Sequence, residues 1–296
     1  MVSATSRQDK LFDLGNSTFL ALVTLAVLYP LIYIVSASFS SAQVVAQGEV
    51  FLWPVEPSLE GYRAVFAFDA VWTGYANTIF YTVVGTVVNV VLTIMAAFPL
   101  SRREFFGRRF FTFYFAFTMF FSGGLIPLYL VVRSLGLLNT RAAMILPTAI
   151  GVWNVIITRT FMQATIPDTL IEAARIDGAS NTYLLVRVVV PLSTPVIAVI
   201  TLFYAVQHWN EFFPALIYLR DPGKQPLQMV LRNVLVANQM AVDEQFIDLD
   251  EMMKRQYLQE LLRYSLIIVA SVPVLLIYPL VQRHFVRGIM IGAIKG

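Results

Sequence analysis

The sequence predicts an all-α polytopic membrane protein with six transmembrane helices. Of its 296 residues, 58% are hydrophobic and only 13% are charged, whereas charged residues make up about 25% of an ordinary soluble domain. The sparse charges leave six long uncharged windows, and a charge at the centre of a membrane helix costs roughly 2.5–3.5 kcal/mol. Because backbone groups in lipid must form hydrogen bonds within their own segment, each window is expected to be a helix.

The predicted spans lie within one transmembrane domain, residues 1–296, and cover about 17–39, 71–100, 110–132, 142–160, 188–216 and 264–282. A membrane helix needs roughly 17–25 residues, and the fourth window is near the lower limit. The first window follows Arg7 and Lys10, as a secretory signal would. Its apolar stretch is longer than the roughly 7–15 residues of such signals, so we expect a retained span.

The placement of Lys and Arg predicts the orientation, because cytoplasmic loops of membrane proteins are enriched in both. With a cytoplasmic N-terminus, the densest basic cluster, SRREFFGRR at 101–109, faces the cytoplasm, and six spans bring both termini to that side. The inner segments then hold 12 of the 21 basic residues: Arg7, Lys10, Arg102, Arg103, Arg108, Arg109, Arg159, Arg175, Arg187, Arg283, Arg287 and Lys295.

A polar, alanine-rich segment, EAARIDGAS at 172–180, lies in the inner loop 164–187 between the fourth and fifth spans. Pro167 suits the first turn of a short helix, and Asp168 or Thr169 can cap its amides. Glu172 adds negative charge near the positive N-terminal end of the helix dipole. The segment therefore predicts a short helix that begins near Pro167.

This helix is expected to end at Gly178, which can adopt a positive φ, and Ser180 or Asn181 can cap a second helix that leads into the fifth span. Residues at helical spacing form a narrow face whose two alanines permit close approach by another surface: Leu170, Ala173, Ala174 and Asp177. Physical chemistry alone leaves two interpretations open, a capped connector and a docking element.

The segment EAARIDGASNTYLLVRVVVPLSTP at 172–195 resembles the signature of importer permeases of the ATP-binding cassette (ABC) class, through Glu172, Ala173, Ala174, Asp177, Gly178, Ala179 and Pro191. Four further segments are similar to the carbohydrate-uptake branch, which includes maltose-type and alginate-type systems: FTMFFSGGLIPLYL (117–130), HWNEFFPALIYL (208–219), QPLQMVLR (225–232) and HFVRGIMIGAIKG (284–296). The resemblance runs essentially from end to end.

The resemblance implies a type I ABC importer permease fold, in which the loop 164–187 forms cytoplasmic coupling helices that sit in a cleft of an ATPase. Small side chains would allow docking, and Glu172 and Arg175 can form ion pairs across an interface. The implied coupling residues are Leu170, Glu172, Ala173, Ala174, Arg175, Asp177 and Gly178.

The chain is not expected to be an enzyme, because the phosphate-binding pattern G-x-x-x-x-G-K-[ST] is absent from it. No cofactor is expected on this chain, and ATP and Mg belong to separate ATPase subunits. The resemblance implies two ATPase subunits, a second permease subunit forming a heterodimer, an extracytoplasmic solute-binding protein and a place in the bacterial inner membrane. Nucleic acid is not an expected partner.

The sequence contains no pattern that indicates metal or thiol chemistry. The chain has no Cys, which excludes disulfides and Cys-ligated zinc. Its two histidines, His208 and His284, are predicted at opposite membrane faces and so cannot share a metal. The acidic run at 243–251 lacks the glycine and spacing of an EF-hand, and we interpret it as part of a solvated loop.

The outer loop 221–263 and the tail 283–296 carry two further predictions. Asp248 and Glu251 resemble a capping box, which indicates a helix from about 249 into the last span. The resemblance implies that this loop contacts the binding protein, and a merely structural helix is the alternative. The tail is apolar and glycine-containing, so a partner surface is expected to order it. The resemblance places it between the ATPase subunits, and a frayed terminus is the alternative.

Polar residues in the spans are candidates for the substrate pathway, because amides and aromatic rings suit the hydroxyls and apolar faces of sugars: Asn77, Asn89, Asn154, Gln207, Trp209, Asn210 and Glu211. Each asparagine can instead bond a neighbouring helix, a contact worth about 0.6 kcal/mol on average. The expected substrate is an oligosaccharide, and the resemblance suggests an acidic, alginate-type one.

Three other classes of function fit the sequence less well. A secondary transporter usually has an ionisable residue near the membrane midplane, and the span centres contain none. A membrane-embedded enzyme needs a catalytic dyad or metal set, and none assembles from the sequence. A receptor or structural subunit is compatible with the composition but leaves the 172–191 signature unexplained.

Overall fold

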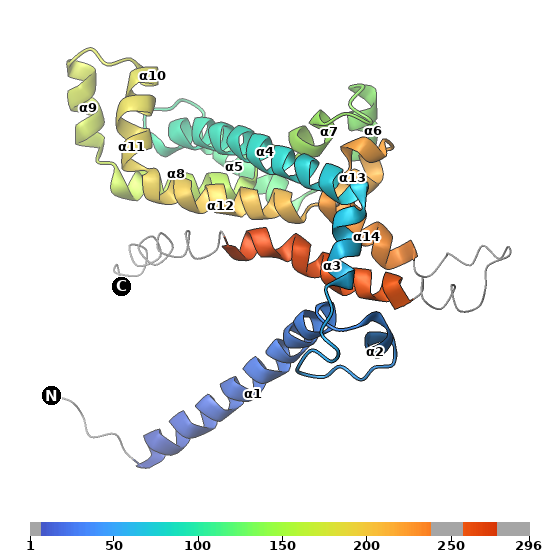
Figure 1. Ribbon diagram of the computed structural model, residues 1–296. Helices are drawn as coiled ribbons and strands as arrows, with labels where there is room; N and C mark the ends of the chain where they lie inside the picture. Colours follow the sequence, from blue (N-terminus) through green and yellow to red (C-terminus); the bar gives the residue numbers. More distant parts are fainter. Residues whose placement is uncertain (1–6, 238–256, 277–296) are drawn as a thin grey trace. The chain divides into compact units, whose positions relative to one another are not determined.

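The computed structural model describes residues 7–237 and 257–276, in which every regular element is a helix. It consists of two compact units. The first comprises residues 1–69 and 233–271, and the second comprises residues 70–232 and 272–296. Figure 1 traces the elements along the chain.

The first unit contains α1 (Arg7–Ser38), α2 (Ala42–Ala46), α3 (Glu60–Ala67) and most of the helix Tyr257–Leu276. Its small core joins Ala37 of α1 and Val44 of α2 to Leu261 of the last helix. Beyond this core α1 is apolar and exposed, with none of its most hydrophobic window buried, which is typical of a helix whose solvent is lipid or another membrane chain.

The second unit is built on three helices that lie side by side: α4 (Asp69–Ser101), α8 (Val152–Thr165) and α12 (Thr194–Asn210). Ile94, Ala97 and Leu100 of α4 pack with Val155 and Met162 of α8 in one buried cluster. A hydrogen bond of 2.7 Å between the hydroxyls of Thr93 and Tyr204 joins α4 to α12. This bundle positions the loops at both of its ends.

Three helices are long and apolar enough to cross a membrane, and three further pairs qualify only if each bent pair is one span. The pairs are α5 (Arg108–Phe120) with α6 (Leu125–Ser134), bent by 116°; α7 (Ala142–Ile145) and η1 (Leu146–Thr148) with α8, bent by 53°; and Asn181–Leu192 with α12, bent by 83°. The segment Asn181–Leu192 contains α10 (Asn181–Tyr183), a π-helical stretch η2 (Leu184–Val189) and α11 (Val190–Leu192).

These bends differ from the expectation that each uncharged window is one helix, and local chemistry accounts for them. In the 110–132 window α5 ends at Phe120 and α6 begins after Gly124, which has φ +85°, a conformation open mainly to glycine. In the fifth window Pro195 has no amide hydrogen to donate to the carbonyl oxygen of Pro191. The hydroxyl of Thr194 donates to that oxygen instead, at 2.7 Å.

The chain continues through α13 (Phe213–Tyr218), η3 (Pro222–Lys224) and α14 (Leu227–Ala237). The predicted span 188–216 therefore contains a break after Asn210, and a new helix begins within it at Phe213, with Pro214 in its first turn. The acidic run at 243–251, the capping box and the tail 283–296 lie outside the described residues.

Candidate functional site

The helix predicted in the inner loop is α9, Asp168–Ile176, which lies at one end of the three-helix bundle (Figure 1). Its N-cap residue is Pro167, and no side chain caps it. The predicted capping by Asp168 or Thr169 is therefore wrong. The carboxylate of Asp168 instead faces the guanidinium groups of Arg102 and Arg103, at 3.6 and 3.7 Å, and charge pairing takes the place of capping.

The C-terminus of α9 confirms the predicted role of Gly178, which has φ +84°. The amide of Gly178 donates to the carbonyl of Arg175 at 2.9 Å, and the amide of Ala179 donates to that of Ala174 at 3.0 Å. This pair of bonds is the Schellman arrangement, which requires a left-handed residue after the helix. Ser180 then caps the next helix by accepting from the amide of Tyr183 at 3.2 Å, as predicted.

The faces of α9 differ from the predicted one. Ile171 is buried, and Ala174 packs against the same cluster as Ile171, so one of the two alanines faces the chain itself. Leu170, Ala173 and Ile176 are exposed, Ile176 to 86%. Glu172 and Asp177 are also exposed. The outward surface of α9 therefore combines apolar side chains with two carboxylates, and Ile176 was not among the predicted coupling residues.

Three ion pairs attach α9 to the loop that follows α4: Asp168 pairs with Arg102 and Arg103, and Arg175 pairs with Glu104. Arg175 pairs with Glu104, so Arg175 is engaged within the chain rather than free for an interface. Arg102, which pairs with Asp168, is buried and donates to the hydroxyl of Ser101 at 2.9 Å and to the carbonyl of Met162 at 3.3 Å. Burial lowers the pKa of Arg102, and the charges of Asp168 and Glu104 oppose that shift.

The sequence pattern does not predict this attachment. It indicates only a topological role for the cluster SRREFFGRR and gives no reason to single out Glu104. Its partner Arg175 lies 71 residues away in the sequence, so no local pattern could have paired them. The four arginines in the cluster were the available signal that an acidic helix lies nearby.

Two of the predicted pathway asparagines make structural contacts. The amide nitrogen of Asn77 donates to the carbonyls of Gly223 and Gln225 at 2.8 and 3.1 Å, and its oxygen accepts from Arg141 at 3.2 Å. The amide nitrogen of Asn89 donates to the carbonyl of Thr148 at 3.3 Å. These are the helix-bridging contacts that the sequence analysis weighed as the alternative.

The other pathway candidates cluster near the end of α12, except Asn154, which is buried in α8. Trp209 is buried, and its ring lies 6.2 Å from that of Tyr75. Gln207 and Asn210 are exposed, and the side chain of Asn210 donates to the carbonyl of Val206 at 2.8 Å. Of the seven candidates, Gln207 and Asn210 are the ones that present polar side chains outside the chain's own core.

Glu211 lies beside a residue that the sequence analysis set aside. Its carboxylate is 3.2 Å from Nδ1 of His208, which is 1% exposed. The His208 ring packs so closely on α4 that a methyl group on Gly85 would lie 2.4 Å from Nε2. Nε2 has no hydrogen-bond partner within the described residues, nor do the buried oxygens of Thr86 and Asn89. Buried polar atoms of α4 and α12 therefore lack hydrogen-bond partners among the described residues.

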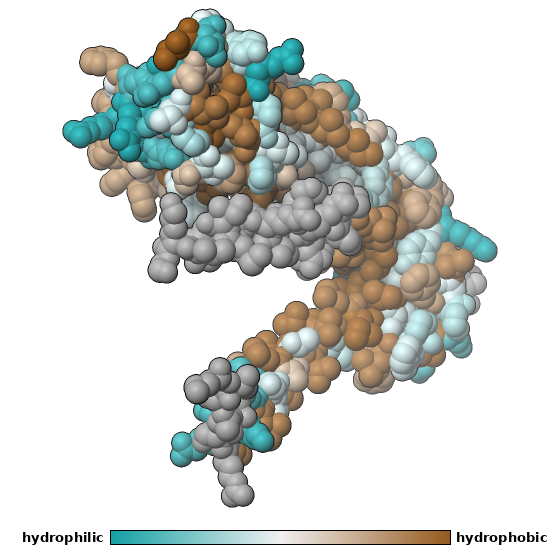
Figure 2. All heavy atoms as spheres, turned by 90° about the vertical axis from the view of Figure 1, so that its left-hand side faces the viewer, coloured by the Kyte–Doolittle hydropathy of each residue, from teal (hydrophilic) through white to brown (hydrophobic). Residues whose placement is uncertain are grey.

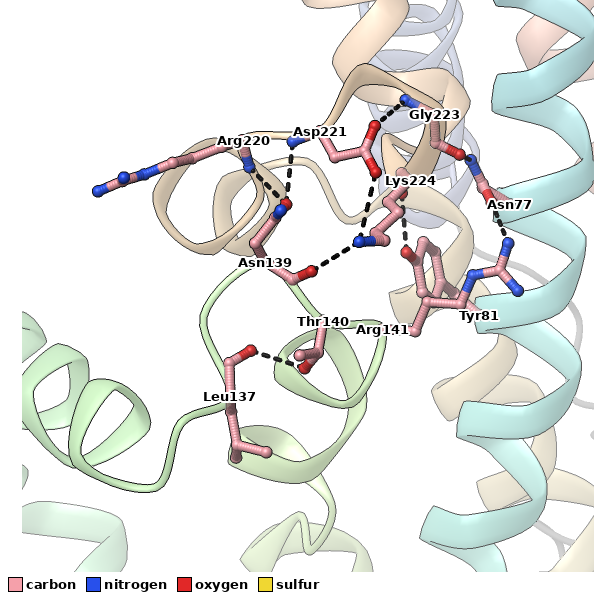
Figure 3. A network of polar contacts seen from close by, with 10 residues as sticks. All are labelled: Asn77, Tyr81, Leu137, Asn139, Thr140, Arg141, Arg220, Asp221, Gly223 and Lys224. Carbon is pink, nitrogen blue, oxygen red and sulfur yellow. Dashed lines mark hydrogen bonds and ion pairs between the residues drawn. The ribbon is translucent and has the colours of Figure 1, made fainter.

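A polar network holds the loops together at the end of the second unit that is opposite to α9 (Figure 3). The side-chain oxygen of Asn139, a residue with φ +58°, accepts from the amides of Arg220 and Asp221 at 3.1 and 2.9 Å. Lys224 donates to the carbonyl of Asn139 at 2.9 Å, and Tyr81 of α4 donates to the carbonyl of Lys224 at 2.7 Å. The amide of Gly223 and the ammonium group of Lys224 lower the pKa of Asp221.

Within the described residues, no group of three or more His, Asp or Glu side chains could hold a metal ion. The described residues form an exposed short helix at one end of the bundle, three ion pairs that attach it, and a braced loop network at the other end.

Comparison with known proteins identifies similar chains. Residues 89–291 match the family described as "Binding-protein-dependent transport system inner membrane component". The chain is 40% identical over 290 residues to the polygalacturonan/rhamnogalacturonan transport system permease protein YtcP of Bacillus subtilis, covering 98% of this chain and 100% of that one. It is also 40% identical to protein LplC of the same organism, over 98% of this chain and 97% of that one.

A solved structure is similar in fold as well as in sequence. A chain of a bacterial ABC transporter involved in the import of the acidic polysaccharide alginate superposes with a TM-score of 0.88 and 39% identity. The match covers 96% of this chain and 100% of the other.

Proposed function

This chain belongs to the family of binding-protein-dependent transport system inner membrane components, and on that premise we propose that it forms half of the membrane pathway of an ATP-driven importer of acidic oligosaccharides. Its fold is the all-helical one of type I ABC permeases. Relatives that import sugar polymers support the substrate class: one is named for polygalacturonan and rhamnogalacturonan, and one structure is of an importer of alginate.

The arrangement of α9 is the observation that carries the proposal. A short helix with an exposed surface of Leu170, Ala173 and Ile176 ends at a left-handed glycine and lies at the end of the bundle. Such a surface on a loop outside the spans suits a groove in another protein. We assign it as the coupling helix that enters the ATPase, on the cytoplasmic side.

Movement of α9 would reach the bundle through two connections. Asp168 and Arg175 join it to Arg102 and Glu104 directly after α4. Ile171 joins it to the buried cluster that contains residues of α4 and α8. ATPase closure that displaces α9 would therefore displace the ends of both helices together, and binding energy released there would bias the two states of the pathway.

The proposed assembly contains two ATPase subunits that carry ATP and Mg, a second, different permease chain and an extracytoplasmic solute-binding protein, in the bacterial inner membrane with both termini cytoplasmic. An ATPase and a binding protein accompany permeases of this family in general. We keep the outer loop 221–263 as the predicted contact of the binding protein and the tail 283–296 as a predicted ATPase contact.

Within the pathway we favour Gln207 and Asn210 as sugar-facing residues, because both are exposed at the end of α12. Asn77 and Asn89 are proposed to hold helices together. Replacing Gln207 by Leu should then reduce transport without lowering the thermal stability of the complex, whereas replacing Asn77 by Leu should lower that stability.

The proposal is tested by purifying the chain with its co-expressed partners and measuring which loaded binding protein stimulates ATP hydrolysis. Galacturonate and alginate oligosaccharides are compared with neutral maltose-type oligosaccharides of equal length. Stimulation by an acidic set alone supports the proposed substrate class. Stimulation by the neutral set alone rejects that class, and hydrolysis that ignores every binding protein rejects the transport function.

A further inference from the structure

We propose that a basic cavity beside α5 binds the headgroup of an anionic phospholipid such as phosphatidylglycerol, whose acyl chains lie along the phenylalanine face of that helix. The cavity has a volume of about 890 Å³ and is bordered by residues 103–107, the first turns of α5 and Arg159 of α8. It lies where α4 ends and α5 begins, and the topology predicted from the sequence puts this turn at the cytoplasmic membrane interface.

The cavity has a large excess of positive charge. Four arginines and one acid, Glu104, line it. Glu104 pairs with Arg175 and Arg103 lies 3.7 Å from Asp168. Three arginines remain, Arg108, Arg109 and Arg159, and none has an ion-pair partner within the described residues. An anion with several acceptor oxygens is the ligand that such a group of guanidinium ions fits.

The backbone adds to the positive electrostatic potential of the cavity. Arg108 and Arg109 open α5, so two cations lie at the positive end of a helix dipole, with no acid in the first turn. Arg159 reaches the cavity from another helix and is held by a bond of 3.0 Å from Nε to the carbonyl of Leu100. Arg108 and Arg159 carry like charges and border the same cavity. Two cations at the positive end of a helix dipole and the like charges of Arg108 and Arg159 are unfavourable without a ligand. Both arrangements become favourable when a phosphate is bound.

A role in membrane topology explains only part of this arrangement. The positive-inside rule requires basic residues in the loop, and the 101–109 segment satisfies it wherever its side chains point. It does not require an arginine from α8 to line the same cavity as the loop arginines. That convergence is what indicates a ligand.

The apolar side of the ligand is matched on α5. Phe110, Phe113, Phe117 and Phe120 recur at helical spacing along one face and are all exposed, and no residue of α5 is buried. Phe106, at the rim of the cavity, is 97% exposed. Figure 2, which turns this end of the second unit toward the viewer, shows hydrophilic surface directly beside hydrophobic surface. A lipid supplies both chemistries, whereas a free phosphate supplies one.

The test uses the purified complex with its partner subunits in detergent, titrated with phosphatidylglycerol and followed by native mass spectrometry. The double variant Arg108→Gln/Arg109→Gln should bind it roughly 30-fold more weakly, since each basic residue near an anionic lipid surface contributes about fivefold. The matched variant Arg133→Gln/Arg220→Gln removes two exposed arginines elsewhere and should bind as the parent does. Phosphatidylethanolamine should bind weakly to all forms.

If the double variant fails to insert into the membrane, the single variant Arg159→Gln tests lipid binding instead. Arg159 lies outside the 101–109 segment that sets the orientation of the chain. It should bind roughly fivefold more weakly. Unchanged binding in the variant that inserts, equal binding of the two lipids, or displacement of the lipid by millimolar inorganic phosphate would each overturn the proposal.

A photocrosslinker identifies the occupant in native membranes. When Phe106 is replaced by p-benzoylphenylalanine, irradiation should give an adduct with the mass of phosphatidylglycerol. A crosslink to the second permease chain instead would show that a protein covers this surface, and the lipid assignment would be wrong.

Discussion

Replacing Gly178 by valine isolates the effect of one backbone conformation on coupling. Gly178 has φ +84°, and nothing lies within 4 Å of the position that a Cβ would occupy. A side chain added there meets no neighbour, so the cost is the strain of a left-handed β-branched residue. That strain is at least about 1–2 kcal/mol.

A change of backbone conformation at residue 178 would relieve this strain only in part. If residue 178 moves to negative φ, the bonds from its amide to Arg175 and from Ala179 to Ala174 are broken, and each is worth about 0.5–1.5 kcal/mol. Either route costs about 2 kcal/mol. The fraction of chains with α9 in its docking conformation then falls by up to roughly 30-fold, and ATPase affinity falls in proportion.

The assay measures ATPase binding to the membrane subunits and the ratio of sugar transported to ATP hydrolysed in proteoliposomes. Gly178→Asn is the matched control, because asparagine tolerates the left-handed region, and it should stay near the parent. Gly178→Ala should fall between them. A valine variant with parental ATPase binding and parental coupling would refute the argument that this turn orients α9.

Three further changes test other contacts. Gly85→Ala places a methyl group 2.4 Å from Nε2 of buried His208 and should destabilise the complex by about 1–3 kcal/mol. A thermal melt should show this loss, and His208→Ala in the same chain should recover part of it. An unchanged melting temperature would contradict the packing of His208 on Gly85. Glu104→Arg should reduce transport and Arg175→Glu should restore it in the double variant, whereas additive losses would mean that the ion pair has no role. Asn139→Ala leaves two loop amides without their acceptor and should cost about 1–3 kcal/mol, measured by the same melt against Asn139→Asp, which retains an acceptor and should be milder.

Local signals in the sequence were sufficient to predict how α9 ends and how the next helix begins. The glycine stop and the serine cap depend on the conformational range of Gly178 and the hydroxyl of Ser180, which are properties of single residues, and both are confirmed. The predicted cap at Asp168 failed because a nearby arginine competes for the same carboxylate. That arginine is distant in sequence, so local rules could not weigh it.

The membrane segments were located by composition, but their shape was not. Hydropathy averages over a window and is insensitive to a break in the helix, so the bends at Gly124 and near Ser193 went unpredicted. The glycine pair and the two prolines that flank Ser193 were visible in the sequence as signals of those breaks.

Contacts between distant helices were the least predictable part. His208 and Gly85 are far apart in sequence, and only the packing of α12 on α4 shows that the glycine makes room for the ring. The same holds for Asn77, whose amide was expected in a pathway and instead binds loop carbonyls.

The most direct test of the central claim is oligosaccharide uptake by proteoliposomes that contain this chain, its partner permease and the ATPase, with the binding protein added at the extracytoplasmic face. The account predicts that uptake of a labelled acidic oligosaccharide requires both ATP and the loaded binding protein, and persists when ionophores collapse all ion gradients. Uptake that continues without ATP and stops with the ionophores would identify a secondary transporter and contradict the account.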